Sequence, residues 1–367
     1  MYIHERKEWP DFRWNTPSLA GLLAEVRHRQ GRLLGRMEAL GFSLREEATL
    51  QTLTRDVVKT SEIEGEKLDA RQVKSSLARR MGLDIGGLPP PDRNVEGIVE
   101  VMLDATRRHD EPLTRERLFG WHAALFPTGR SGMRPIAVGR WRTKQSGAMQ
   151  VVSGPIGRER VHFEAPGYDR LAKEMARFIK WCNTPPEIDP VIKSALAHFW
   201  FVTIHPFEDG NGRIARAIAD LLLSRSEGIS HRFYSMSAQI QRERDDYYEI
   251  LERCQKSDLD ITAWINWFLN CLNRAIGASE QTLKAVLTKA AFWKTHADES
   301  FNERQRKVIN RLLDGFEGKL TSSKWAKLTK SSPDTALRDI NDLVGRSILS
   351  KDEAGGRSTS YTLCLPS

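Results

Sequence analysis

The 367-residue sequence has few cysteines and no long apolar run. Its four cysteines lie far apart, with no C-x-x-C pair and no histidine at metal-ligand spacing, which argues against a disulfide framework and a zinc site. The longest apolar stretch, residues 195–204, is far too short to cross a bilayer. The N-terminus is charged where a signal peptide has its apolar region. We therefore expect a cytoplasmic protein with reduced thiols and no membrane segment.

Strand-like patterns are also scarce, which predicts a mainly helical fold. Helical spacing of apolar residues predicts helices over residues 17–40, 46–64, 94–108, 114–125, 167–182, 190–204, 212–226 and 243–254 and after residue 260. Gly65 lies where a left-handed C-terminal cap is expected for the second of these helices. Three glycines and three consecutive prolines in residues 82–92 cannot continue a helix and mark the clearest internal boundary.

One interruption of the helical pattern is strand-like. Residues 149–152 and 161–163 are two short β-prone runs around a glycine-proline turn, and they predict a small β-hairpin on the helical body. Such a hairpin either covers a core or offers an edge that holds an extended peptide by main-chain hydrogen bonds. The sequence leaves both interpretations open.

The charge balance is basic, with 56 Lys and Arg against 48 Asp and Glu, and it favours affinity for anions such as nucleotides or nucleic acid. Residues 301–367 carry half of the surplus. This segment predicts three helices and a small hairpin, at residues 302–313, 321–328, 332–344 and 347–363. That order resembles a winged helix-turn-helix domain, whose third helix would expose Arg338 with Lys327 and Lys330 just before it. Binding of DNA, binding of protein and a spacer role stay open.

The most informative segment is His-Pro-Phe-Glu-Asp-Gly-Asn-Gly-Arg-Ile-Ala-Arg, residues 205–216. A helix begins near Gly212, so the glycines lie at a helix N-terminus, where unpaired N–H groups and the helix dipole favour an anion. Gly210 and Gly212 let a phosphate approach the main chain without a Cβ in the way. Arg213 and Arg216 share a face of the first turn and can both reach a polyphosphate.

Three more residues of this segment fit phosphate chemistry. Asp209 precedes the glycine turn, where one carboxylate and phosphate oxygens commonly hold magnesium. A neutral His205 at the mouth of the turn could take the proton of an attacking hydroxyl. Phe207 would point into the core and anchor the loop. A lone histidine or a lone pair of glycines would be explained by a structural role. The histidine, aspartate, Gly-Asn-Gly and two arginines together within twelve residues instead predict a triphosphate site.

A carboxylate lies on the apolar stripe of the second predicted helix. At 100° per residue, Glu64 falls in the stripe of Leu50, Leu53 and Val57, and it also lies at the helix C-terminus, where the dipole repels negative charge. Such a group needs a cationic partner or a raised pKa, unless the helix end frays and solvates it.

Residues 205–216 resemble the active-site signature of Fic proteins, H-P-F-x-D-G-N-G-R-x-x-R, at every specified position. Fic proteins are mostly protein AMP-transferases, which move AMP from Mg-ATP to a target hydroxyl and release pyrophosphate. The resemblance implies one role for each signature residue: His205 as general base, Phe207 as anchor, Asp209 as the Mg²⁺ ligand, Gly210, Asn211 and Gly212 as the hole for the α-phosphate, Arg213 as the contact to the β- and γ-phosphates, and Arg216 as the contact to the γ-phosphate.

The same resemblance assigns two further elements. The hairpin at 149–163 is where the family carries its flap, which docks the target segment. The Tyr247-Tyr248 pair falls where family members place an aromatic residue at the adenine, and Tyr248 is the preferred candidate, although a packed core tyrosine would look the same in sequence.

An inhibitory motif of the family is also matched. Residues 60–65, Thr-Ser-Glu-Ile-Glu-Gly, fit [S/T]-x-x-x-E-[G/N], whose glutamate, here Glu64, pairs in the family with the second signature arginine, here Arg216, and obstructs the γ-phosphate. Residues 2–14 resemble the N-terminal domain of many bacterial Fic proteins. The expected domains are an N-terminal helical domain with the inhibitory helix, a Fic core and a winged-helix domain, at residues 1–88, 89–290 and 300–367.

The resemblance therefore implies an autoinhibited protein adenylyltransferase that uses ATP and Mg²⁺ and modifies Ser, Thr or Tyr hydroxyls of a partner or of itself. Two alternatives remain: a deAMPylase in which Glu64 orients a water, and a DNA-binding regulator acting through residues 301–367. Relatives of the signature transfer other phosphate-containing groups as well, so ATP as donor rests on the resemblance. The sequence does not name the target, and it is compatible with a homo-oligomer.

Overall fold

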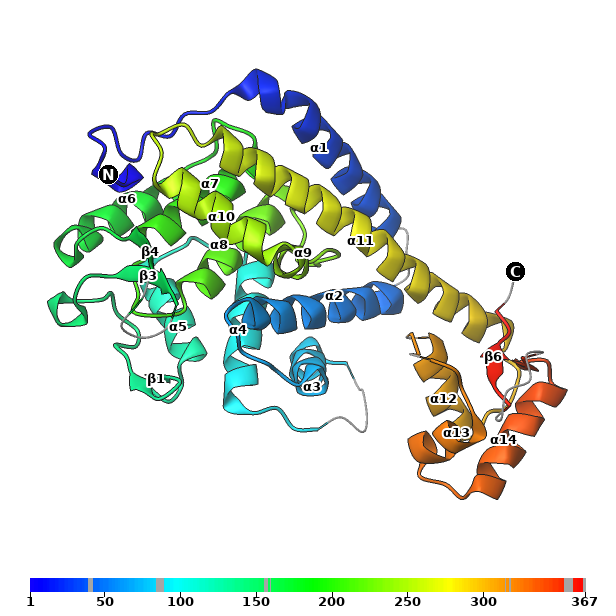
Figure 1. Ribbon diagram of the computed structural model, residues 1–367. Helices are drawn as coiled ribbons and strands as arrows, with labels where there is room; N and C mark the ends of the chain where they lie inside the picture. The colour runs from blue at the N-terminus through cyan, green and yellow to red at the C-terminus, as the bar shows by residue number, and fades with distance from the viewer. Residues whose placement is uncertain are drawn as a thin grey trace. The chain divides into compact units, whose positions relative to one another are not determined.

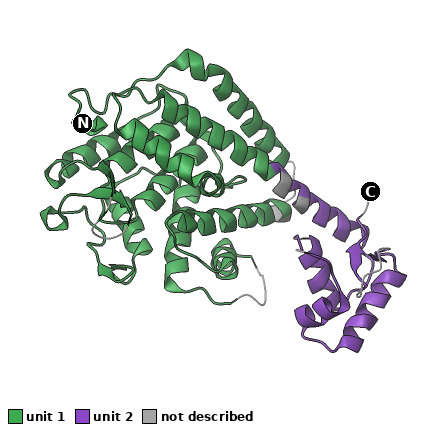
Figure 2. Ribbon diagram, in the orientation of Figure 1, with its two compact units in different colours: residues 1–279 green, residues 280–367 purple. Residues whose placement is uncertain are grey.

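The computed structural model describes residues 1–38, 42–83, 89–154, 158, 160–313, 315–316, 318–352 and 359–365. The chain forms two compact units, residues 1–279 and 280–367 (Figure 2), and the division falls within helix α11. The boundary expected at residues 82–92 lies partly outside the described residues. The three domain limits expected from the sequence stay predictions.

The first unit is built almost entirely of helices (Figure 1). Its helices are α1 (Thr16–Glu38), α2 (Phe42–Ile63), α3 (Ala70–Met81), α4 (Arg93–Arg107), α5 (Arg115–Leu125), α6 (Leu171–Asn183), α7 (Pro190–Ile204), α8 (Asn211–Glu227), α9 (Met236–Arg242), α10 (Arg244–Gln255) and the first part of α11 (Thr262–Thr295). Its strands form two antiparallel hairpins, β1 (Arg130–Ser131) with β2 (Arg134–Pro135) and β3 (Gln150–Ser153) with β4 (Arg160–Glu164). The predicted mainly helical fold is confirmed.

Two helices of this unit were not predicted. Helix α3 is strongly charged, so its apolar stripe is short, but Asp69 caps its N-terminus and Gly82 ends it in the left-handed conformation. Helix α9 is only seven residues long and begins at the side-chain cap of Ser235. Capping chemistry, more than apolar periodicity, defines both helices.

Helix α7 forms the centre of this unit. Every residue from Val191 to Ile204 is buried, which fits a helix that is apolar on all sides. Helix α8 packs along α7, and its residues from Ile214 to Ser224 are also buried. The segment that joins these two helices, residues 205–210, is therefore anchored at both ends by a buried helix.

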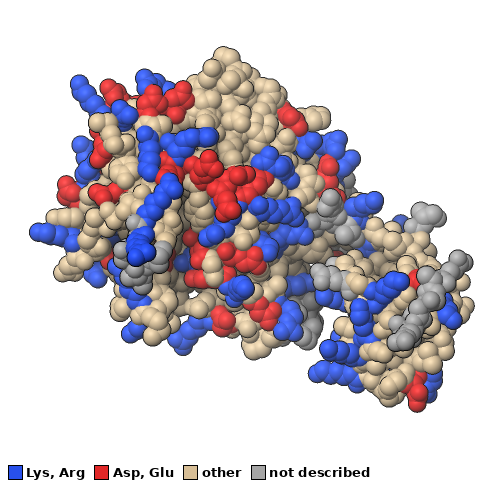
Figure 3. Space-filling view, viewed as in Figure 1, with Lys and Arg blue, Asp and Glu red and all other residues tan. Residues whose placement is uncertain are grey.

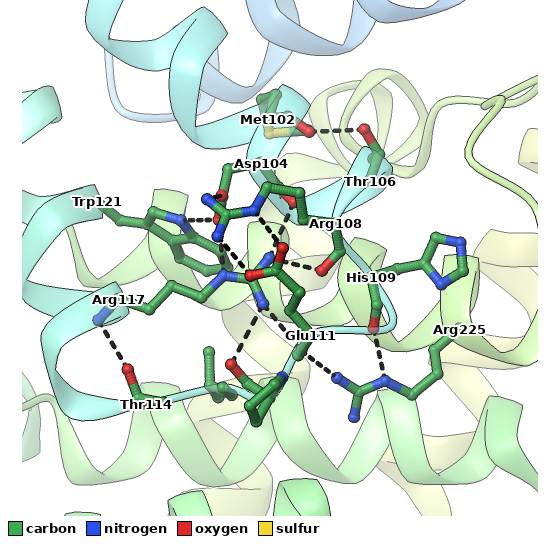
Figure 4. Close-up of polar contacts among 12 residues, drawn as sticks. Met102, Asp104, Thr106, Arg108, His109, Glu111, Thr114, Arg117, Trp121 and Arg225 are labelled. Carbon is green, nitrogen blue, oxygen red and sulfur yellow. Dashed lines mark hydrogen bonds and ion pairs between the residues drawn. The ribbon is translucent and has the colours of Figure 1, made fainter.

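A polar network ties the end of α8 to the corner between α4 and α5 (Figure 4). Asp104 on α4 accepts a hydrogen bond from Arg117 Nε on α5 (2.6 Å). Arg225 near the end of α8 donates to the carbonyl oxygens of His109 (2.7 Å) and Glu111 (2.9 Å) in the connection between those helices. These bonds fix α8 relative to α5.

The β3–β4 hairpin confirms the strand prediction at 149–152 and 161–163; the predicted turn at 155–157 lies outside the described residues. Val151 pairs with Phe163 and Val152 pairs with Val161, so the register shifts by one residue between these pairs. His162 is the extra residue of the resulting β-bulge, and a bulge redirects the side chain that it carries.

The second unit contains the end of α11 and a small helical domain. Its elements are α12 (Glu303–Leu313), α13 (Ser322–Thr329), α14 (Pro333–Gly345), β5 (Leu349–Lys351) and β6 (Tyr361–Leu363). Trp325 and Ile340 are fully buried in its core, and Leu320 forms an isolated antiparallel β-bridge with Tyr361. The helices and strands match the sequence prediction, and residues 353–356 of the predicted turn lie outside the described residues.

Among the described residues, we find no helix with the length and apolar character that a membrane crossing requires.

Candidate active site

The segment between α7 and α8 turns sharply through two left-handed residues. His205 ends α7 with φ +51°, and Gly210 precedes α8 with φ +78°. A Cβ at Gly210 would lie 2.8 Å from Cε2 of Phe126, so both the backbone angle and the space require glycine. The turn places the N-terminus of α8 beside His205.

Asn211 holds this turn closed. Its Oδ1 accepts a hydrogen bond from the backbone N–H of Phe207 (3.0 Å), and its Nδ2 donates to the carbonyl oxygen of Phe207 (2.9 Å). Both polar atoms of this buried amide side chain are thus bonded to the loop. The structure brings Asn211 to the predicted position, while its part in an anion hole stays a prediction.

Phe207 is fully buried and stacks on His122 of α5, with ring centroids 4.1 Å apart. His122 Nδ1 accepts from the N–H of Gly139 (3.1 Å), so Nε2 carries the proton and donates to the carbonyl of Asp209 (3.2 Å). Burial lowers the pKa of His122 to about 4, which keeps the ring neutral. Sequence reasoning missed His122, because nothing near it in the chain marks a histidine that supports a loop 87 residues away.

Arg142 is a second supporting residue that the sequence did not reveal. Its buried guanidinium donates through Nε to the carbonyl oxygen of His205 (2.8 Å) and also contacts the carbonyl of Pro166, while its backbone N–H donates to Pro206 (2.9 Å). Burial lowers the pKa of Arg142 to about 10, so it remains a cation at neutral pH. This charge lies beside the residue predicted to act as base.

One ring nitrogen of His205 has no hydrogen-bond partner among the residues that the structure describes. Its Nδ1 lies 3.2 Å from the carbonyl oxygen of Val202, which can only accept, so Nδ1 carries the proton and Nε2 has a free lone pair. Burial lowers the pKa of His205 to about 4, and the Arg142 charge acts in the same direction. The imidazole is therefore neutral near pH 7, the form that a general base requires.

Asp209 keeps an exposed carboxylate at the same turn. Its side chain is 41% exposed and lies 4.0 Å from Arg213 Nη2. Its Oδ1 accepts from the N–H of Gly210 (2.5 Å), and its Oδ2 accepts from the hydroxyl of Ser131. Each oxygen retains a lone pair, and a single carboxylate with phosphate oxygens is a normal site for Mg²⁺, so the residues present fit that ion.

Arg216 is paired with the end of α2. Its side chain is 1% exposed, and Nη2 donates to Glu64 Oε1 (2.7 Å) and to the carbonyl of Thr60 (2.9 Å), while Nε donates to the Thr60 hydroxyl (2.7 Å). Burial alone would lower the pKa of Arg216, but the charge and hydrogen bond of Glu64 together with the neighbouring Tyr247 and Tyr248 outweigh burial and raise the pKa. The cationic partner expected for Glu64 is thus present in the structure.

One expectation for Glu64 was wrong. Helix α2 ends at Ile63, so the 100° periodicity no longer applies and Glu64 does not lie on the buried face; its side chain is 28% exposed. Gly65 follows with φ +84°, as expected for the residue after the helix. The carboxylate reaches Gly212, where a Cβ would overlap Glu64 Oε1.

Arg213 has a carboxylate partner of its own, which sequence reasoning missed. Its Nη1 donates to Glu66 Oε2 (2.9 Å), its side chain is 4% exposed, and its guanidinium lies over the Phe126 ring at 5.0 Å. Glu66 comes two residues after Glu64 and outside the motif pattern, so no periodic or motif signal marked it. Two acidic residues from one turn of chain therefore occupy both signature arginines.

Buried guanidinium donors remain at the N-terminus of α8. Within the described part of the chain, Arg213 Nε and Arg216 Nη1 have no hydrogen-bond acceptor. Arg216 Nη1 lies 3.2 Å from the position of a Cβ on Gly212, beside the helix N-terminus. Buried unsatisfied donors next to a helix N-terminus fit an anion with several acceptor oxygens, as a polyphosphate has.

The N-terminus of α8 borders a cavity of about 900 Å³ through Gly212. His205, Gly212 and Glu64 line it, together with the β3–β4 hairpin and α10. On α10, Tyr248 is 37% exposed and lies under Arg244, whereas Tyr247 is buried and hydrogen-bonded to His198 (2.9 Å). The position of Tyr248 suits a ligand contact and that of Tyr247 suits the core, but the adenine assignment stays a prediction.

Comparison with known proteins identifies two domains. Residues 112–223 match the Fic/DOC family, so the chain contains a Fic/DOC domain. Residues 2–83 match a domain of unknown function, DUF4172. The chain is 33% identical over 148 residues to the protein adenylyltransferase Fic of Nematostella vectensis and 28% identical over 218 residues to that of Drosophila melanogaster.

These matches are partial. They cover 39% and 58% of this chain but only 30% and 39% of the two relatives, so the chain spans about a third of their length. The fold is similar to a Fic family protein from Desulfovibrio desulfuricans (TM-score 0.55, 22% identity, 95% of this chain and 97% of that one). It is also similar to a Fic domain containing signaling protein from Bacteroides thetaiotaomicron (TM-score 0.54, 19% identity, 71% and 97%). These similarities show that the fold is that of Fic structures.

The state of His205 gives a first prediction. With a pKa of about 4, only about 1% of the rings are protonated at pH 6. We expect the ring resonances of His205 to stay constant between pH 5.5 and 8 in an NMR titration, with the assignment taken from the signal that His205→Ala removes. A midpoint between pH 6 and 7 would contradict the proposed desolvation of the ring.

Proposed function

We propose that the protein is an autoinhibited protein adenylyltransferase, which transfers AMP from Mg-ATP to a Ser, Thr or Tyr hydroxyl of a protein and releases pyrophosphate. One observation carries the proposal. A neutral His205 with a free Nε2 opens onto the same cavity as the N-terminus of α8, where buried guanidinium donors of Arg213 and Arg216 lack acceptors. The names of the relatives support this reaction class.

Each residue of the signature has a task in this reaction. The N–H groups of Asn211 and Gly212 bind the α-phosphate at the turn that Gly210 forms, and the two arginines bind the β- and γ-phosphates. His205 Nε2 takes the proton of the attacking hydroxyl as its oxygen bonds to the α-phosphorus and pyrophosphate departs. Bound at Asp209, Mg²⁺ would neutralise charge on the phosphates.

The β3–β4 hairpin is the proposed docking site for the target segment. Val152 and Val161 are 47% and 38% exposed, and they form a cross-strand pair beside the cavity. Exposed valines on a two-stranded edge suit an extended peptide, which adds main-chain hydrogen bonds to the edge. This supports the second of the two interpretations that the sequence left open.

Glu64 is the proposed brake. Its carboxylate holds Arg216 and covers Gly212, so a γ-phosphate must displace it before Arg216 can bind that phosphate. A second candidate function keeps the site and reverses the reaction. Glu64 and His205 line one cavity, so Glu64 could instead orient a water that removes AMP from a modified protein.

Removal of the Glu64 carboxylate distinguishes the adenylyltransferase from the deAMPylase. With Mg²⁺, α-labelled ATP and a cell lysate, Glu64→Gly should label lysate proteins at least about tenfold more strongly than the wild type, since Arg216 becomes available to nucleotide. Glu64→Gly combined with His205→Ala should not label them. The matched control is Glu62→Gln, which changes a carboxylate of the same turn that pairs with Lys59.

Equal labelling by Glu64→Gly and wild type would contradict the brake. If Glu64→Gly labels nothing and instead loses the ability to release AMP from pre-modified proteins, the deAMPylase function is correct.

Glu66 should act as a weaker second restraint. Its pair with Arg213 is half-exposed at the carboxylate, and such a pair contributes about 1 kcal/mol, which is about fivefold in affinity. We therefore expect Glu66→Gln in the Glu64→Gly background to lower the KM for ATP about fivefold, measured by transfer kinetics. If Glu66→Gln leaves the KM for ATP unchanged, or if Glu62→Gln in the same background lowers the KM equally, Glu66 does not compete with the nucleotide.

Residues 300–367 are proposed to be a winged helix-turn-helix domain that binds DNA. Helix α14 begins at a Ser332 cap with Pro333 in the first turn and packs against α13, and Arg338 is exposed on it. Lys327 and Lys330 are also exposed, and Figure 3 shows lysine and arginine side chains on the visible face of this unit. Cations on and before a recognition helix suit phosphate contacts.

Duplex binding should therefore depend steeply on salt. We expect fluorescence anisotropy with the full chain to show that the substitutions Lys327→Gln, Lys330→Gln and Arg338→Gln together reduce the slope of log affinity against log salt by about 2 to 3.

The matched control removes three exposed lysines of the first unit, Lys7, Lys173 and Lys180. If both triple variants change the slope equally, the second unit is not the DNA-binding surface.

A further inference from the structure

The β3–β4 hairpin and α10 share a chain of hydrogen bonds that the reaction described above does not use. Ser153 Oγ lies 2.5 Å from His162 Nε2, and His162 Nδ1 lies 2.6 Å from Glu252 Oε2. His162 occupies this position because it is the extra residue of the bulge, which directs its ring toward α10. Hydroxyl, imidazole and carboxylate thus form a continuous relay.

The proton positions in this relay are set by its carboxylate end. Glu252 is ionised: burial favours the neutral acid, but hydrogen bonds from Lys256 and His162 lower its pKa to about 2. A carboxylate only accepts, so Nδ1 of His162 carries a proton, and the tautomer with this single proton accepts the Ser153 hydroxyl proton at Nε2. This is the arrangement that activates a serine as a nucleophile.

The fold does not require the relay. Ser153 is exposed, and the strand ladder holds the hairpin without it. Glu252 has cationic partners of its own in Lys256 (2.6 Å) and Arg160 (3.1 Å), so its charge is compensated without a protonated His162.

The relay and the phosphate site face the same space. Ser153, His162 and Glu252 line the cavity of about 900 Å³ that His205 and Gly212 also line. Glu252 lies four residues after Tyr248 on α10, so both side chains project from one face of that helix. A nucleotide that binds between Tyr248 and the N-terminus of α8 therefore enters the cavity that holds the Ser153 hydroxyl.

We propose that Ser153 is an internal acceptor of the adenylyl group, with His162 as its base and Glu252 as the residue that positions His162. This inference rests on the proposed adenylyltransferase function. Ser153 Oγ bonds to the α-phosphorus of ATP, the bond between the α-phosphorus and its bridging oxygen breaks, and pyrophosphate leaves. The hydroxyl proton passes to His162 Nε2, where Glu252 stabilises the imidazolium.

The test maps adenylate on the intact protein. Glu64→Gly is incubated with Mg²⁺ and ATP, digested and analysed by mass spectrometry. We expect adenylate on the peptide that contains Ser153. Ser153→Ala should lose it, and Ser153→Thr should carry it on the new hydroxyl.

His162→Gln should reduce the rate of this modification about 100-fold, a contribution within the usual range of a general base. The matched control is Ser350→Ala. Ser350 is an exposed strand serine of the other unit whose hydroxyl contacts a carbonyl oxygen, not an imidazole, and its loss should change nothing.

The outcomes separate the two proposals. Labelled lysate proteins without adenylate on Ser153 would overturn the internal acceptor and leave the proposed function intact. Modified Ser153 with an unchanged rate in His162→Gln would overturn the relay. If Glu64→Gly labels neither itself nor any lysate protein, the proposed function fails and the internal acceptor fails with it.

Discussion

The buried charge of Arg216 is the constraint on which the rest of the site depends. A guanidinium with 1% exposure needs a counter-charge and acceptors, and the end of α2 supplies both through Thr60 and Glu64. The same contact attaches α2 to the first turn of α8. In the proposed function, the group that a γ-phosphate binds is also the group that docks the N-terminal helix, so nucleotide binding and helix position would be thermodynamically linked.

The remainder of the site is held by contacts from several segments of the chain. Helix α7 is buried on all sides, His205 is held in a left-handed conformation, and Asn211 closes the turn from within. Arg142 fixes the carbonyl of His205 from another segment. Strained backbone of this kind persists only where several contacts determine it together. Donors held in place before the substrate arrives stabilise developing charge without a cost of reorganisation.

The sequence predicted the parts of the site that are local in the chain. The spacing within residues 205–216 is enough to predict the turn, the helix N-terminus and the position of the two arginines. Gly65 likewise predicts the end of α2. The contacts between distant segments could not be predicted in this way. Arg142 meets His205 and Glu66 meets Arg213 only after α2, α7 and α8 pack, and His162 turns toward Glu252 only because of a bulge. The burial expected for Glu64 was wrong for a related reason, since periodicity places a side chain only while the helix continues.

Charge balance explains how such a site can both be closed and be opened. Glu64 and Glu66 bring two negative charges to Arg213 and Arg216, so each of these buried arginines has a carboxylate partner in the closed site. A Mg²⁺-bound triphosphate also brings net negative charge, so in the proposed reaction it can replace the two carboxylates without leaving a buried arginine unpaired. Because Glu64 and Glu66 are both partly exposed, each can move into water at little cost. Arg213 and Arg216 are buried and cannot move into water in this way. In the proposed reaction the two arginines therefore stay in place while one set of anions replaces the other.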